Sequence, residues 1–129
     1  VSTLGLERGL RGTFDFKVEE RFSTGHVGVQ VLSTPGMIAM MEMASMKLVQ
    51  PYLDEGSTTV GTKVCVEHKA PAPLGAIVTV VTELVSVEGR RLEFSVSAHW
   101  GGRLLGEGKH ERYIVNKDRF AAKLKEELS

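Results

Sequence analysis

Residues 35–46, with the sequence PGMIAMMEMASM, contain a single charged side chain, that of Glu42. Thr34 can cap a helix at this point and Pro35 suits the first helical position, so we predict a helix from Thr34 to about Gln50. This helix is apolar on nearly all sides, and such a helix is stable in water only when other parts of the chain cover it. The fold is therefore expected to form around one central helix.

The carboxylate of Glu42 is unusual in this setting. Its helical neighbours Ile38, Ala39, Ser45 and Met46 include no cation. Removing a carboxylate from water without a partner costs on the order of several kcal/mol. We therefore expect that Glu42 either takes part in chemistry or pairs with a residue that the fold brings in from elsewhere.

The rest of the chain has the pattern of an antiparallel sheet. Alternating apolar and polar residues predict a first strand over residues 13–18, and residues 20–33 are expected to form a loop before the helix. Four longer strands are predicted over residues 58–70, 75–87, 92–100 and 103–115. A short C-terminal helix over residues 117–128, capped by Asn116, is predicted to follow them.

One curved antiparallel sheet wrapped around one long helix covers that helix with few elements. The sequence therefore predicts an α+β chain with the hotdog fold, in one domain over residues 1–129. Such a sheet has an open edge, and pairing of the edges of two copies protects it from other chains. We expect a homodimer for this reason.

The charge balance limits the partners of this chain. Lys plus Arg and Asp plus Glu each number 16, so the formal net charge is zero. Nucleic acids and membrane surfaces attract basic surfaces, so neither is an expected partner. Cys65 is the single cysteine and no apolar run approaches the roughly 20 residues that span a bilayer, which together favour a cytoplasmic location. Motifs of phosphate loops, nucleophile elbows and zinc sites do not occur.

The strand over residues 58–70 is predicted to direct its even-numbered side chains at the helix. These are Val60, Thr62, Val64, Val66, His68 and Ala70. A single histidine in such a place is most often a core or interface residue, but Glu42 also points inward, and the two together favour a site. Cys65 lies on the opposite face of the strand, where a packed thiol at an interface is expected.

Two further groups are candidates. Thr34 precedes Glu42 by two helical turns, so both can project to one side of the helix, although capping alone would also explain Thr34. In the last strand, one face carries Gly106, Gly108, His110 and Arg112. Glycines in a strand indicate a bend, a bulge or the close approach of another group, and Arg112 is either a surface ion-pair residue or an anion contact.

Several segments together resemble a known family. They are Thr34 and residues 41–44, 61–68, 73–75, 84–92 and 110–112. This combination is similar to the hotdog thioesterases that hydrolyse fluoroacetyl-CoA, and the resemblance covers most of the chain from Thr34 onward. It implies that Thr34, Glu42 and His68 form a catalytic set. It also implies that Gly61 and Arg112 line the site.

The segment before Thr34 departs from that family. The family has a lid with phenylalanines just before its catalytic threonine, whereas residues 25–33 contain none and the nearest is Phe22. A segment with Gly25 and Gly28 cannot present the same aromatic gate. The resemblance therefore supports hydrolysis of an acyl-CoA thioester and leaves the acyl group open.

We accordingly expect an enzyme that converts an acyl-CoA to a free acid and coenzyme A. No metal is expected, and no cofactor other than the coenzyme A of the substrate. Glu42 would act as general base or nucleophile, and Thr34 would orient the water or the carboxylate. His68 would polarise the carbonyl group or protonate the departing thiolate.

Backbone amides of Gly36, Met37 or Gly61 are candidate donors to the oxyanion that forms during hydrolysis. Gly36, Gly61 and Arg112 are the expected substrate-binding residues. Two other functions stay open. A hotdog dehydratase or hydratase also places a histidine and a carboxylate beside an acyl thioester, and a non-catalytic acyl-CoA-binding protein would bind the ligand without releasing thiol.

Overall fold

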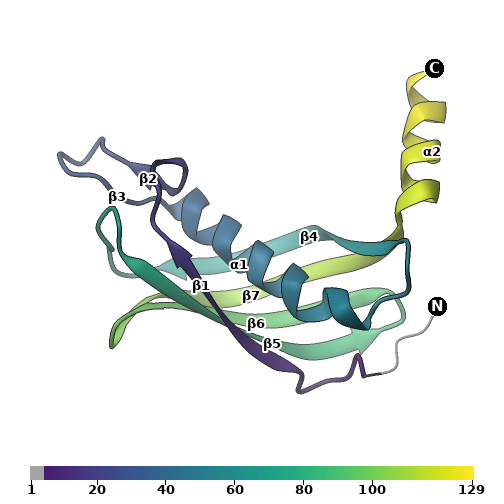
Figure 1. The fold of residues 1–129 in the computed structure, drawn as a ribbon, viewed down its shortest axis with the longest axis horizontal. Helices are drawn as coiled ribbons and strands as arrows, with labels where there is room; N and C mark the ends of the chain where they lie inside the picture. Colours follow the sequence, from purple (N-terminus) through teal and green to yellow (C-terminus); the bar gives the residue numbers. More distant parts are fainter. Residues whose placement is uncertain (1–4) are drawn as a thin grey trace.

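One curved antiparallel sheet and one long helix make up most of the fold. The computed structural model describes residues 5–129. The strands follow the order β1–β5–β6–β7–β4, so β4 lies at an open edge. Their bounds are Arg11–Lys17 for β1, Ser57–His68 for β4, Ile77–Glu88 for β5, Arg91–Trp100 for β6 and Arg103–Asn116 for β7. Helix α1, Thr34–Val49, lies along one face of this sheet (Figure 1), and the predicted α+β arrangement is confirmed.

The segment predicted as a loop before α1 contains short elements. A 3-10 helix, η1, spans Glu20–Phe22, and the strands β2 (Ser23–Thr24) and β3 (Val31–Leu32) pair as a hairpin. Strands of two residues are too short to produce a visible alternation, which is why the sequence predicts a loop. At the other end of the chain, the predicted C-terminal helix is confirmed as α2, Lys117–Leu128, which stands away from the sheet (Figure 1).

Ser33, not Thr34, is the N-cap of α1. Its side-chain oxygen accepts a hydrogen bond from the amide of Gly36 at 3.0 Å. Thr34 is already the first helical residue, and the helix continues into a 3-10 turn, η2, at Gln50–Tyr52. Serine and threonine are both common N-caps, so residue type alone does not decide between Ser33 and Thr34. The prediction that Thr34 caps the helix is wrong, and its hydroxyl group is available to another partner.

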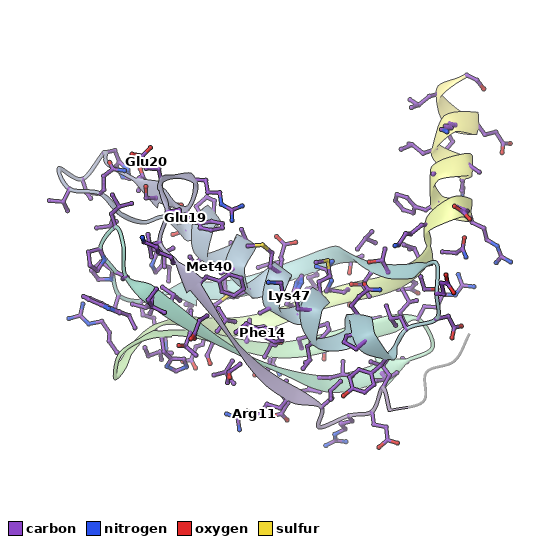
Figure 2. All side chains as sticks on the ribbon, viewed as in Figure 1. Arg11, Phe14, Glu19, Glu20, Met40 and Lys47 are labelled. Atoms are coloured by element: carbon purple, nitrogen blue, oxygen red, sulfur yellow. The ribbon has the colours of Figure 1, made fainter. Side chains whose placement is uncertain are left out.

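One side of α1 packs on the inner face of the sheet. Its buried apolar residues are Met37, Met40, Met41, Ala44, Leu48 and Val49. Each large side chain buried in this way stabilises the fold by roughly 1.5–3 kcal/mol. Phe14 of β1 packs against this core, and the amine of Lys47 lies 5.4 Å from the ring centroid of Phe16 (Figure 2). Met37, Met40 and Met41 are therefore core residues.

The other side of α1 is not fully covered within one chain. Its partly exposed residues are Ile38, Ala39, Glu42, Met43 and Met46. The sequence predicts a helix covered all round, because it is apolar all round. A single chain buries one side only, which leaves an apolar stripe with one carboxylate in it.

A β-bulge divides β4 into two halves. Gly61 pairs with Arg112 and Lys63 pairs with Glu111, so Thr62 is an extra residue in β4. An extra residue exchanges the two faces of a strand, because side chains alternate with a period of two.

The bulge corrects the prediction that all even-numbered side chains of this strand face the helix. Before the bulge the odd-numbered Thr59 is buried, whereas after it the even-numbered Val66 and His68 lie on the inner face. The prediction is right for the second half of the strand. It is wrong for Thr62, whose hydroxyl group bonds to Glu111 on the outer face, and for Val60.

Candidate active site

Thr34 and His68 meet where α1 begins and β4 ends. Oγ1 of Thr34 lies 2.8 Å from Nδ1 of His68. Thr34 is the first residue of α1 and His68 is the last residue of β4, so two rigid elements hold the pair. The hydrogen bond restricts rotation of the imidazole ring and directs its other nitrogen.

That other nitrogen, Nε2 of His68, is buried and has no hydrogen-bond partner among residues 5–129. A buried polar atom without a partner costs about 1–3 kcal/mol. A catalytic role is one of the recognised reasons for keeping such an atom. The imidazole is therefore a strong candidate for contact with a ligand.

An open groove of about 790 Å³ leads to this pair. Thr34 and His68 line it together with Val27, Val29 and Val31 of the β2–β3 segment. This volume is typical of sites for small molecules and cofactors. None of the groove's lining residues is a phenylalanine, and Phe22 is buried elsewhere with 4 % of its surface exposed. The groove thus has no aromatic gate of its own, as the sequence predicts.

Glu42 lies in a second cluster, where its partner is a cation from β7. Oε2 of Glu42 is 3.9 Å from Nη1 of Arg112, and the two side chains are 41 % and 7 % exposed. The sequence predicts that Glu42 either takes part in chemistry or pairs with a residue from elsewhere in the chain, and the pairing is observed. The carboxylate is half exposed in one chain, not fully buried. Arg112 is not a surface ion-pair residue, because it is buried.

The guanidinium of Arg112 is held in place by neutral partners. Its Nε donates to Oγ1 of Thr59 at 2.7 Å, and its Nη2 donates to the carbonyl oxygen of Thr59 at 2.9 Å. Its Nη1 donates to Nε2 of His110 at 3.2 Å. Burial lowers the pKa of Arg112, and Glu42 acts in the opposite direction. The fixed guanidinium in turn orients the carboxylate of Glu42.

His110 is a residue of this cluster to which the sequence assigns no function. Its Nδ1 donates to the carbonyl oxygen of Lys63 at 2.8 Å, so its Nε2 must be the acceptor for Arg112. Only the neutral imidazole satisfies both bonds. Burial lowers the pKa of His110, and the charge of Arg112 adds to this effect. The one signal in the sequence is its place on the same strand face as Arg112.

Gly61 leaves the space that the Glu42 carboxylate occupies. A Cβ at this position would lie 2.7 Å from Oε2 of Glu42 and 3.3 Å from Nη1 of Arg112. Any other residue would displace one of the two charged groups. Gly106 reflects a close approach of the same kind, because a Cβ there would lie 2.6 Å from Sδ of Met37 on α1.

Neither candidate amide at the helix start is free to bind an oxyanion. The amide of Gly36 donates to Oγ of Ser33 at 3.0 Å, and the amide of Met37 donates to the carbonyl oxygen of Ser33 at 2.9 Å. A Cβ on Gly36 would overlap the backbone of Phe22, so this glycine lets α1 begin close to η1. Of the three amides predicted as oxyanion donors, the amide of Gly61 remains a candidate.

The two clusters lie apart along α1. Thr34 and Glu42 are eight residues apart, which corresponds to about 12 Å along a helix axis. Among residues 5–129, no hydrogen bond or ion pair joins Glu42 to His68. A single chain therefore holds a Thr34–His68 pair and a separate Glu42–Arg112 pair.

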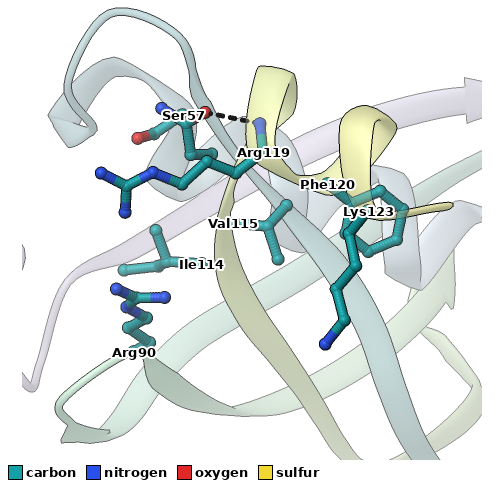
Figure 3. Close-up of a pocket in the computed structure, with 8 residues that line it drawn as sticks. Ser57, Arg90, Ile114, Val115, Arg119, Phe120 and Lys123 are labelled. Atoms are coloured by element: carbon teal, nitrogen blue, oxygen red, sulfur yellow. Dashed lines mark hydrogen bonds between the residues drawn. The ribbon is translucent and has the colours of Figure 1, made fainter. Parts of the chain in front are cut away.

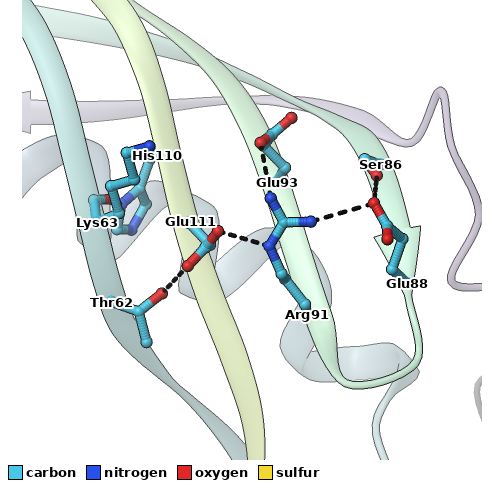
Figure 4. Close-up of polar contacts among 8 residues, drawn as sticks. All are labelled: Thr62, Lys63, Ser86, Glu88, Arg91, Glu93, His110 and Glu111. Carbon is cyan, nitrogen blue, oxygen red and sulfur yellow. Dashed lines mark hydrogen bonds and ion pairs between the residues drawn. The ribbon is translucent and has the colours of Figure 1, made fainter.

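A polar network on the outer face holds the bulge of β4. Thr62 donates to Glu111 at 2.7 Å, and Glu111 also accepts from Nε of Arg91 at 2.6 Å (Figure 4). Arg91 reaches Glu88 and Glu93 as well, at 3.1 and 3.3 Å. The hydrogen bonds from Thr62 and Arg91 lower the pKa of Glu111. The network ties β4, β7 and β6 together directly behind Gly61.

Cys65 is exposed on the edge strand β4. Within residues 5–129, no three His, Cys, Asp or Glu side chains are placed to bind a metal ion. No helix in this part of the chain is long and apolar enough to cross a membrane.

Known proteins share this architecture and much of this sequence. The model of the family described as fluoroacetyl-CoA-specific thioesterase matches residues 16–118. The fluoroacetyl-CoA thioesterase of Streptantibioticus cattleyicolor is 39% identical over 131 residues, which cover 95% of this chain and 94% of that protein. A solved structure of the fluoroacetyl-CoA thioesterase has a TM-score of 0.86 at 39% identity, covering 93% of this chain and 96% of the other.

Two more distant structures agree. A Thermus thermophilus protein described as a thioesterase superfamily member has a TM-score of 0.82 at 32% identity, with 95% of each chain covered. A hot-dog-like protein from Thermanaerovibrio acidaminovorans has a TM-score of 0.85 at 25% identity, over 95% of this chain and 93% of its own. The fold is therefore the predicted hotdog fold, and the chain belongs to the fluoroacetyl-CoA-specific thioesterase family.

Proposed function

We propose that this chain hydrolyses an acyl-CoA thioester to a free acid and coenzyme A, with Glu42, Thr34 and His68 as its catalytic set. Membership of a thioesterase family gives the reaction class. The observation that carries the site is the buried Nε2 of His68, which Thr34 holds in a groove and which has no partner among the described residues.

Water is the nucleophile in the proposed reaction. Glu42 takes a proton from water as the water oxygen bonds to the thioester carbon, which produces a tetrahedral oxyanion. The carbon–sulfur bond then breaks, and His68 delivers a proton to the departing sulfur. The proton held by Glu42 returns to His68 through solvent, so both residues recover their starting state. The amide of Gly61 is the proposed oxyanion donor. Arg112 contributes to the binding site by orienting the carboxylate of Glu42.

We propose further that a homodimer completes this site. In one chain Glu42 and His68 belong to separate clusters, so the Thr34–His68 pair of one subunit would face Glu42 of the partner subunit. Two features support this arrangement. β4 is an unpaired sheet edge, and the partly exposed side of α1 that carries Glu42 is apolar enough to need cover.

A register for such a pairing must accommodate the bulge of β4, and we propose one that places His68 opposite Gly61. Opposed residues of an antiparallel pair point to the same face, and Gly61 and His68 both point inward. If each His68 lies opposite Gly61 of the partner subunit, and each Thr62 remains an extra residue, Cys65 lies opposite Cys65 of the partner subunit. The dimer axis then passes through Cys65 on the outer face.

The native cysteine provides the test of this dimer. Directly opposed residues in an antiparallel pair have Cα atoms about 4.5–5.5 Å apart, within the range that a disulfide spans. We expect mild oxidation to produce a covalent dimer through Cys65. The matched control is Lys63→Cys in a Cys65→Ser background, because residue 63 would face residue 67 of the partner subunit. A monomer in solution, or equal cross-linking of both variants, would overturn the register.

Thiol release from acyl-CoA tests the reaction itself. Wild-type chain should release coenzyme A thiol, and Glu42→Gln should lower kcat by roughly a hundredfold or more through loss of the general base. A Glu42→Gln variant with the wild-type rate would remove Glu42 from the mechanism. Hydration of an enoyl-CoA without thiol release would favour the dehydratase alternative, and binding without any turnover would favour a non-catalytic acyl-CoA-binding protein.

The substrate and location follow from the same proposal. Acyl-CoA is the proposed substrate, with coenzyme A as part of it and with no resident cofactor or metal. A cytoplasmic location is proposed, supported by the single cysteine of the chain. Comparing short, branched, aromatic and long acyl-CoAs in the thiol assay would identify the acyl group.

A further inference from the structure

Helix α2 leaves its apolar face uncovered. No residue of α2 is buried, and Phe120, Leu124 and Leu128 are 50%, 49% and 78% exposed. These three residues follow each other at intervals of four, so they form one row on the helix surface. An isolated helix of about 12 residues is only marginally stable in water. A helix of this kind is stable when another surface covers its apolar row.

The position of α2 points to a second copy of this chain as the covering surface. The amide of Lys117 donates to the carbonyl oxygen of Gly56, so α2 starts beside the beginning of the edge strand β4. In the dimer proposed above, the start of β4 lies next to residues 71–73 of the partner subunit. Val31 forms a β-bridge with Pro73, which ties the β2–β3 hairpin to residues 71–73. In the proposed dimer, the hairpin of the partner subunit therefore also lies near the start of β4.

That hairpin carries its own exposed apolar side chains. Val27 and Val29 are 60% and 64% exposed and lie between β2 and β3. In one chain they are at the opposite end of the molecule from α2, so they cannot cover its apolar row (Figure 1). A two-fold axis through β4 exchanges the two ends and brings each hairpin to the α2 of the other subunit.

Charge complementarity supports the same pairing. A cavity of about 270 Å³ beside α2 is bordered by Arg90, Arg119, Lys123 and the ring of Phe120 (Figure 3). None of these three cations forms an ion pair among residues 5–129. Next to the hairpin, Glu19 and Glu20 are both exposed (Figure 2), and Glu19 is paired with Arg21 at 3.1 Å. Glu20, which has no ion pair among residues 5–129, is the carboxylate that the basic groove would receive together with the apolar hairpin.

We propose that α2 of each subunit packs on the β2–β3 hairpin of its partner and forms the outer wall of the groove that leads to Thr34 and His68. This inference rests on the dimer of the proposed function. Phe120 of the partner subunit then lies near Val27 and Val29, which line the groove. An aromatic side chain that the hairpin itself lacks is supplied from the other subunit.

Paired cysteines test this contact without relying on catalysis. In a Cys65→Ser background, Val29→Cys with Leu124→Cys should form an intersubunit disulfide on oxidation, seen as a covalent dimer on a non-reducing gel. Val29→Cys with Glu126→Cys is the matched control, because residue 126 lies on the opposite side of α2. No disulfide, or equal yields from both pairs, in a protein that remains dimeric would overturn the proposal.

Kinetics give a second, separate measurement. Phe120→Ala should raise the KM for acyl-CoA roughly three- to tenfold through loss of apolar contact, with a smaller effect on kcat. An unchanged KM would overturn the role in the groove wall. Binding of wild-type chain to anionic lipid vesicles, without the disulfide, would assign α2 to a membrane surface instead. Absence of thiol release with the disulfide present would instead contradict the proposed function and leave this contact intact.

Discussion

Oγ1 of Thr34 lies 2.8 Å from Nδ1 of His68, while the cap of α1 is formed by the residue before it, Ser33. Two adjacent hydroxyl groups thus have different partners. The hydroxyl group of Ser33 caps the helix, whereas that of Thr34 bonds to the imidazole of His68. Under the proposed mechanism, this difference assigns stability to Ser33 and catalysis to Thr34.

Substitution of these two residues should give opposite results. Ser33→Ala should lower the free energy of unfolding by about 1 kcal/mol through loss of the cap, with little change in kcat. Thr34→Val should lower kcat roughly tenfold or more, because Nδ1 of His68 loses its partner, and Thr34→Ser should retain most activity. Denaturant titration and the thiol assay measure the two effects. A Thr34→Val variant with normal kcat would assign the threonine a structural role only.

Gly61→Ala should disturb the carboxylate of Glu42. The added methyl group would lie 2.7 Å from Oε2 of Glu42, so the carboxylate must move, and a shift of about 1 Å at a catalytic group can cost roughly a hundredfold in rate. Gly102→Ala is the control, since a Cβ there meets nothing within 4 Å. We expect kcat to fall in the first variant and to stay unchanged in the second. Equal rates would show that the carboxylate position does not matter.

Arg112→Lys should destabilise the fold although the charge is kept. A lysine cannot replace both bonds to Thr59, at 2.7 and 2.9 Å, and leaves a buried oxygen unpaired. The free energy of unfolding should fall by about 1–3 kcal/mol. Arg103→Lys, at an exposed position, should change it by less than about 0.5 kcal/mol. Denaturant curves of the two variants, measured under the same conditions, test this difference in the free energy of unfolding.

His110 should make stability depend on pH in the mildly acidic range. Burial lowers its pKa in the folded chain, whereas the unfolded histidine keeps an ordinary pKa of about 6.5. The unfolded state therefore binds the proton first, so the stability contribution is complete above about pH 6.5 and is lost as the pH falls toward the folded pKa.

The measurement is the free energy of unfolding between pH 7 and pH 5. Glu111, whose pKa is lowered by Thr62, loses its contribution only below its ordinary pKa of 4.5, so the two effects separate. His110→Gln should flatten the curve in this range, because its amide can donate and accept without titrating. An unchanged slope in that variant would assign the pH dependence to another group.

Most of the fold follows from the sequence because its signals are periodic. Every strand of the main sheet begins and ends within two residues of its predicted limits. The bulge at Thr62 could not be predicted from the order of apolar residues in the strand. A bulge changes the face to which each side chain points and leaves that order the same. The hairpin at β2 and β3 was missed because each strand has two residues.

The candidate site follows from the sequence only in part. Glu42 and His68 stand out as a carboxylate and an imidazole in apolar surroundings, but their partners come from far along the chain. Arg112 reaches Glu42 from 70 positions away, and His110 acts behind it as a neutral acceptor. Contacts of this kind depend on how the strands align, and alignment is decided by tertiary packing and not by local pattern.

The extra residue gives β4 one position at which its length can change without turning side chains over. Gly61 and Lys63 pair with the consecutive residues Arg112 and Glu111, so a strand without Thr62 would alternate regularly, with Gly61 and His68 still facing inward. Homologous chains that are one residue shorter at this point should therefore keep the cluster around the helix carboxylate. A deletion at any other place in the strand would lack this compensation and would reverse the faces of all side chains on one side of it.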